Sequence, residues 1–179
     1  MPFIELNNQL PGITGLLEQY EETAKPLREL AETLLRGESP LTAGERELIA
    51  ALVSERNECI FCSYSHGAAA GHLLEEGKEL VRQVREDFRT APVSDKLKAL
   101  LNIAAQVQLG GKEVREEDIE VARSLGATDR EIHDTVLIAA AFCMYNRYVD
   151  GLGTYAPPEE VMYDRPGREL ADKGYVRNN

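Results

Sequence analysis

The sequence predicts an all-α fold of about seven to eight helices. Three observations indicate this class: apolar residues recur with the helical period of about 3.6, two capping-box patterns mark helix starts, and no stretch has a convincing strand pattern. With 179 residues, of which 43% are hydrophobic, the chain is long enough to bury one sizeable core. We expect one helical domain over residues 1–155 and an extended tail over residues 156–179.

The first half of this domain is expected to contain four helices. They are predicted over residues 14–20, 23–36, 42–57 and 58–70. Pro26 falls in the first turn of the second helix, where proline is tolerated. Thr42 and Glu45 form a capping box at the start of the third helix, and Asn57, which tolerates left-handed geometry, suits its end. Gly71 closes the fourth helix.

Four more helices follow, with breakers between them. They are predicted over residues 77–88, 94–109, 116–125 and 128–151. Thr128 and Glu131 form the second capping box and open the longest helix. Its middle, Val136–Tyr145, is apolar on every side, so we expect this helix to be central and buried. From Ala156 onward, three prolines and many charges favour an extended or loosely ordered tail.

Composition excludes several classes of partner. The formal net charge of −11 argues against nucleic acid and against an anionic membrane surface. The longest apolar run is ten residues, too short for a membrane span, and the N-terminus lacks the pattern of a signal peptide. We therefore expect a cytoplasmic protein, in which three cysteines are too few for a disulfide scaffold. A Cys-x-x-Cys motif in that compartment indicates redox or metal chemistry.

The chemistry of the chain is concentrated between Glu47 and His66. Cys59 and Cys62 lie three residues apart, and His66 follows Cys62 by four, so a helix would place all three on one face. A thiol reacts as its thiolate, and a helix N-terminus can lower its pKa while a histidine takes its proton. Glu47, on the preceding helix, could orient His66 or relay a proton. Two cysteines at this spacing can form a disulfide, so one can attack and the other can resolve.

Two other interpretations of these residues remain. The cysteines could be buried small residues with no redox role. They could also bind zinc, because Cys59, Cys62 and His66 supply three ligands and either Glu47 or His72 would have to be the fourth. A thioredoxin-like site is disfavoured, because the βαβ context of that motif is absent.

The motif resembles the active-site signature of the AhpD-like alkylhydroperoxidases, which belong to the carboxymuconolactone decarboxylase superfamily. Its elements are Glu47, eleven residues, Cys59, two residues, Cys62, three residues and His66. Residues 10–50 and the segment Met144–Gly153 are also similar to the subgroup called peroxidase-related enzymes. The resemblance covers most of residues 10–155, and the full motif is far more specific than Cys-x-x-Cys alone.

The resemblance implies a helical protein that assembles as a trimer or hexamer and reduces hydrogen peroxide or organic hydroperoxides. In the family pattern Cys62 is peroxidatic and Cys59 resolving, while Glu47 and His66 occupy the proton-relay positions. An external dithiol reductant, in the best-known members a lipoyl-bearing protein, would regenerate the thiols, and neither cofactor nor metal is implied. Some family peroxidases carry a histidine immediately before the second cysteine, where this chain has Phe61.

Two further functions remain open. One is a thiol-disulfide oxidoreductase that acts on a substrate other than peroxide. The other is a redox-responsive binding or assembly module, in which the cysteine pair switches a helix face or a subunit contact. The superfamily's lactone decarboxylases lack the cysteine pair, so that activity is not expected here.

Residues outside the motif receive mainly structural interpretations. Cys143 lies inside the apolar run and is expected to be a buried core residue. His72 suits a surface or helix-capping position, and His133 suits a structural one. Polar residues follow the apolar run and are expected to pack, to contact another subunit or to line a pocket; they are Asn146, Arg147 and Asp150, the last two spaced for a mutual ion pair. Tyr64 and Tyr145 are further pocket candidates.

Overall fold

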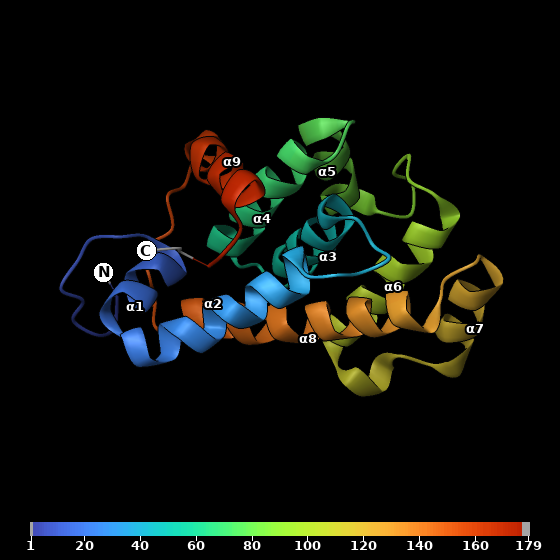
Figure 1. The fold of residues 1–179 in the computed structure, drawn as a ribbon, viewed down its shortest axis with the longest axis horizontal. Helices are drawn as coiled ribbons and strands as arrows, with labels where there is room; N and C mark the ends of the chain where they lie inside the picture. Colours follow the sequence, from blue (N-terminus) through green and yellow to red (C-terminus); the bar gives the residue numbers. More distant parts are fainter. Residues whose placement is uncertain (1, 177–179) are drawn as a thin grey trace.

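The computed structural model describes residues 2–176, which form nine α-helices, two short 3₁₀ helices and no strand (Figure 1). The helices are α1 (Gly12–Gln19), α2 (Glu21–Arg36), α3 (Ala43–Arg56), α4 (Ile60–Leu73), α5 (Gly77–Asp87), α6 (Asp95–Leu109), η1 (Gly111–Glu113), α7 (Glu116–Ser124), α8 (Asp129–Gly151), η2 (Glu160–Tyr163) and α9 (Asp164–Lys173). The predicted all-α class is confirmed, and each of the eight predicted helices is present within three residues of its expected ends. The predicted trimer or hexamer concerns several chains and stays a prediction.

Helix α3 forms the centre of the core. Its residues from Arg46 to Ser54 are all buried, because α4 packs against one side and α6 and α8 against others (Figure 1). Leu48, Ile49 and Val53 are fully buried. Each such side chain contributes roughly 1.5–3 kcal/mol to folding. The predicted capping box at Thr42 and Glu45 is present and fixes where this helix begins.

Helix α8 is buried less evenly than its sequence indicates. Ile138 and Phe142 lie in the core, on the side that faces α3 and α6. Leu137 and Met144, from the same apolar run, are 40% and 43% exposed. The expectation of a helix buried on every side is therefore corrected. The run is apolar all round, but part of its surface stays exposed to solvent.

The turn between α3 and α4 differs from prediction in a way that places the cysteines. Asn57 keeps right-handed geometry, and Glu58 takes the left-handed conformation, with φ of 59°. The Asn57 side chain is held by Asn146 and Gln108, which explains its ordinary backbone. Helix α4 therefore begins at Ile60, two residues later than expected, and continues past the predicted stop at Gly71 to Leu73.

The C-terminal segment is not the extended tail that the sequence predicts. Residues 160–173 form η2 and α9, and α9 lies across α4 (Figure 1). Pro166 lies in the first turn of α9, where its missing N–H group costs nothing. A Cβ added to Gly167 would lie 2.4 Å from the Cβ of Ala68, so glycine allows the close approach of α9 to α4. The prolines and charges of this segment therefore led to a wrong prediction of an extended tail, because both also suit a short surface helix.

Candidate active site

Cys59 and Cys62 lie together at the N-terminus of α4. Cys59 is the N-cap residue and Cys62 is the third residue of the helix. Cys59 thus lies just before the helix that was predicted to include it, and the two cysteines pack together in one buried cluster. Both cysteines are free and buried, with exposed fractions of 0% and 2%. The motif therefore produces a contacting pair of thiols in the reduced state.

The Cys62 thiol is held in its protonated form. Its pKa is raised well above the ordinary value, first by the hydrogen bond with Cys59 and then by burial. A hydrogen bond from the Asn146 side chain acts in the opposite direction. The helix N-terminus was expected to lower this pKa, and that expectation is corrected because the neighbouring thiol and the buried setting outweigh it. Cys62 consequently needs a base to become a nucleophile at neutral pH.

Asn146, near the C-terminal end of α8, connects the turn to the region of the cysteines. Its Oδ1 accepts a hydrogen bond of 2.8 Å from Asn57 Nδ2, and its Nδ2 donates to Ser54 Oγ at 3.0 Å. It is 1% exposed, so these polar contacts lie inside the core. Nearby, burial raises the pKa of the Asp150 carboxyl, and the Cys59 thiol acts in the opposite direction. Of the roles considered for these polar residues, packing beside the cysteine pair describes Asn146.

Glu47 and His66 form the second half of the candidate site. His66 lies on α4, one turn after Cys62, and its Nδ1 is 2.8 Å from Oε2 of Glu47 on α3. Glu47 is completely buried. Burial alone would raise the pKa of this carboxyl, but the charge and hydrogen bond of His66, together with Arg36 and Tyr175, lower it below its usual range. Glu47 is therefore a buried carboxylate that orients the imidazole.

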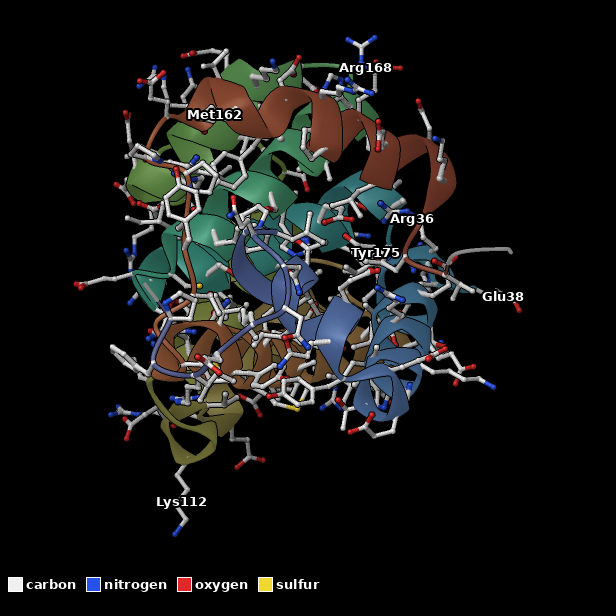
Figure 2. All side chains as sticks on the ribbon, turned by 90° about the vertical axis from the view of Figure 1, so that its left-hand side faces the viewer. Arg36, Glu38, Lys112, Met162, Arg168 and Tyr175 are labelled. Carbon is white, nitrogen blue, oxygen red and sulfur yellow. The ribbon has the colours of Figure 1, made fainter. Side chains whose placement is uncertain are left out.

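Two residues that sequence reasoning missed complete this arrangement. Arg36, the last residue of α2, donates from Nη2 to Glu47 Oε1 at 2.7 Å, and Tyr175 Oη donates to the same oxygen at 2.5 Å. Figure 2 shows Arg36 and Tyr175 beside each other below the end of α9. Tyr175 follows a charged segment with no apolar pattern, so no motif could have found it. Arg36 ends a predicted helix, where a cation is ordinary.

Apolar residues cover the cysteine pair. Ile13 of α1, Phe61 and Val149 pack on the two thiols. The Phe61 ring makes an edge contact with Tyr163, with centroids 5.8 Å apart. Phe61 thus takes part in a lid between the N-terminal and C-terminal segments, and it supplies no proton at that position. Cys62, which is 2% exposed, lies beneath this apolar cover.

The remaining candidates lie away from the cysteines. Cys143 is buried in the core as predicted. His72 is half-buried, with Nε2 2.9 Å from Asp164 Oδ1, and so joins α4 to α9. His133 is 3.0 Å from its neighbour Asp134, in a surface cluster. Arg147 donates to the Cys143 carbonyl, one turn back, and forms no ion pair with Asp150 in the described chain.

The two tyrosine pocket candidates also have other contacts. Tyr145 is buried, and its hydroxyl donates to the Leu27 carbonyl at 2.8 Å, which makes it a core residue. Tyr64 packs edge-on against Tyr163, with ring centroids 5.4 Å apart.

The donor set does not suit the zinc alternative. Among residues 2–176, no group of three or more histidine, cysteine, aspartate or glutamate side chains is placed to hold a metal ion. Both oxygens of Glu47 are already bonded within the protein, and His72 is turned to α9.

Within residues 2–176, no helix combines the length and apolar character needed to cross a membrane.

Comparison with solved structures places this site in a known fold. The chain is 31% identical to an uncharacterized peroxidase-related protein from Silicibacter sp. TM1040, with a TM-score of 0.74 over 84% of this chain and 78% of that one. The chain belongs to the AhpD-like, peroxidase-related family. A structure described as an alkylhydroperoxidase AhpD core, an uncharacterized peroxidase-related protein from Ralstonia eutropha JMP134, is 28% identical, with a TM-score of 0.77 over 87% and 82%.

A more distant structure supports the fold alone. It is a protein of unknown function from Agrobacterium tumefaciens, 22% identical, with a TM-score of 0.68 over 83% of this chain and 99% of that chain. No family model and no curated protein matches the sequence. The AhpD-like family is thus established by structural neighbours, and the resemblance noted in the motif agrees with it.

Proposed function

We propose that this AhpD-like protein is a cysteine-pair peroxidase for hydrogen peroxide or organic hydroperoxides, with a role in antioxidant defence. One observation carries the proposal. Two free thiols packed together at its start begin the helix that, one turn later, presents a histidine held by a buried carboxylate. That combination supplies a nucleophile, a resolving thiol and an oriented base.

The proposed reaction balances without a cofactor. The Cys62 thiol gives its proton to His66, and its sulfur attacks the terminal oxygen of the peroxide. The O–O bond breaks, the leaving oxygen takes the proton as water or alcohol, and Cys62 becomes a sulfenic acid. The Cys59 sulfur then attacks Cys62, a disulfide forms, and the sulfenic oxygen leaves as water. Cys62 is the peroxidatic residue because it shares α4 with His66.

Glu47 assists this reaction without moving far. A carboxylate on Nδ1 keeps the imidazole in one orientation and stabilises the imidazolium that forms after Cys62 loses its proton. Because Arg36 and Tyr175 already bond Oε1, Glu47 serves as an anchor. An external dithiol, for which a lipoyl-bearing protein is the proposed source, closes the cycle by reducing the disulfide.

The test is peroxide consumption in the presence of a synthetic dithiol. We expect steady turnover by the wild-type protein and none by Cys62→Ser. Cys59→Ser is treated with peroxide in the absence of the dithiol, and there we expect oxidation of Cys62 to the sulfenic acid without formation of the Cys59–Cys62 disulfide. Cys143→Ser is the matched control, since it removes a buried thiol outside the pair and should leave turnover unchanged. Unchanged peroxide consumption by Cys62→Ser would overturn the proposal.

A further inference from the structure

The segment after α9 is anchored so that one tyrosine enters the site. Gly174 ends α9 with φ of 71°, a conformation that favours glycine, and turns the chain back toward α2. The backbone N–H groups of Tyr175 and Val176 then donate to Oε2 of Glu32 at 2.6 and 3.3 Å. This carboxylate of α2 fixes the backbone on either side of the tyrosine ring.

The Tyr175 side chain contacts Glu47, His66 and Arg36. Its Oη lies 2.5 Å from Glu47 Oε1 and 3.2 Å from His66 Nδ1. Its ring is nearly parallel to the His66 ring, at an interplanar angle of 15° with centroids 6.0 Å apart. The Arg36 guanidinium lies over the Tyr175 ring, with its central carbon 5.2 Å from the ring centroid. Tyr175 is thus a wall of the histidine site as well as a hydrogen-bond donor.

These contacts decide which nitrogen of His66 is basic. Glu47 Oε1 accepts from Arg36 and Tyr175, and Oε2 faces His66 Nδ1. A carboxylate whose charge is balanced in this way accepts a hydrogen bond from a protonated Nδ1 of the imidazole. Nε2 is then the unprotonated nitrogen. Burial raises the pKa of Tyr175 well above its ordinary value, so its hydroxyl stays a donor.

Every element around His66 contributes to this setting. Glu47 faces it from α3, Arg36 approaches through Glu47 from α2, and Tyr175 closes it from the C-terminal segment. Helix α8 supplies Phe142, an uncharged ring in edge contact at 4.5 Å. On α4 itself the nearest titratable group of the motif is Cys62, one turn away.

We propose that Tyr175 is a positioning residue: with Arg36, its hydroxyl fixes the Glu47 carboxylate and thereby holds His66 with Nδ1 protonated and Nε2 available as the base for Cys62. The inference rests on the proposed function for its catalytic consequence. Its structural content, the tautomer of His66 and its dependence on Tyr175, holds independently of any peroxide.

The test compares Tyr175→Phe with Tyr145→Phe. Both remove a tyrosine hydroxyl that is hydrogen-bonded within the protein, but Tyr145 donates to the Leu27 carbonyl in the core. Two measurements are made on fully reduced protein: the ¹⁵N NMR signals of the His66 ring, and the rate of Cys62 alkylation by iodoacetamide from pH 6 to 10, followed by peptide mapping. Melting temperatures of all three proteins control for stability.

We expect wild-type and Tyr145→Phe proteins to show the Nδ1–H tautomer and the same alkylation profile. In Tyr175→Phe the tautomer signal should become mixed, and Cys62 alkylation should slow by about tenfold at pH 7, the effect of one hydrogen bond to a charged group. The difference should vanish at high pH, where the thiol ionises without a base. A uniform slowing at every pH, or an unchanged His66 signal, would overturn the inference.

Peroxide reactivity is then measured separately. Loss of the tautomer in Tyr175→Phe together with no peroxide oxidation of wild-type Cys62 would sustain the positioning role and refute the peroxidase. Peroxide oxidation of Cys62 together with an Nδ1–H tautomer that is insensitive to Tyr175 would sustain the peroxidase and refute the positioning role.

Discussion

Nδ1 of His66 lies 2.8 Å from Oε2 of Glu47, and the carboxylate that makes this contact is entirely buried. The two residues come from α4 and α3, the helices that pack most closely at the centre of the fold. A buried carboxylate needs partners, and here an arginine and a tyrosine from distant parts of the chain supply them. The site and the core therefore depend on the same charge.

Glu47→Gln should destabilise the fold strongly. It leaves Arg36, which is 13% exposed, without its counter-ion, and removing one partner of a buried pair costs about 3 kcal/mol or more. Chemical denaturation of Glu47→Gln at pH 7 measures this loss. Glu79→Gln, which breaks an exposed pair with Arg82 on α5, is the control, and its effect on stability should be much smaller because water already solvates both charges.

A comparison of wild type with Glu47→Gln also tests the pKa of Glu47. Because the pKa is lowered in the folded chain, the folded state binds fewer protons than the unfolded state at acid pH. The stabilisation is fully present above the unfolded pKa of about 4.3 and is lost as pH falls through the folded pKa. The stability gap between wild type and Glu47→Gln should thus not narrow from pH 7 to 5, and it should narrow below about pH 4. A gap that narrows already between pH 7 and 5 would contradict the lowered pKa.

The Cys62 thiol should titrate late. The hydrogen bond with Cys59 and burial raise its pKa, so thiolate absorbance in the ultraviolet should keep rising beyond pH about 8.5, where an ordinary cysteine is half ionised. The difference spectrum between wild type and Cys62→Ser isolates this thiol. In Cys59→Ser, which removes the neighbouring thiol, the midpoint should move down. A Cys62 midpoint at or below pH about 8.5 would contradict the account.

The docking of α9 should be coupled to the site. Gly167→Ala places a Cβ against Ala68 and the α4 backbone, and overpacking of this kind costs about 1–3 kcal/mol. Because α9 precedes Tyr175, its displacement should disturb the His66 signal in the manner of Tyr175→Phe. Gly151→Ala, at a position where an added Cβ meets nothing within 4 Å, is the control. NMR of the His66 ring measures both variants, and equal spectra for the two would refute the coupling.

The sequence predicted the fold because periodicity and caps are local signals. Thr42 and Thr128 marked helix starts correctly, and Gly37 followed a helix end. The contact of Glu47 with His66 was also foreseeable, since the family motif joins them. Tyr175 was not foreseeable, because a tyrosine after a charged segment gives no sign of where α9 will deliver it. The direction of the Cys62 pKa shift was mispredicted for a similar reason. This pKa depends on burial and on a neighbouring thiol, whereas the position at a helix start alone indicated a lowered pKa.

The most direct test of the peroxidase is a thiol count. The protein is fully reduced, freed of reductant, treated with one equivalent of cumene hydroperoxide and then denatured. The chain has three cysteines, so the account predicts a fall from three thiols to one and a Cys59–Cys62 disulfide in the peptide map. A count that stays at three, in protein whose cysteines react normally after denaturation, would contradict it.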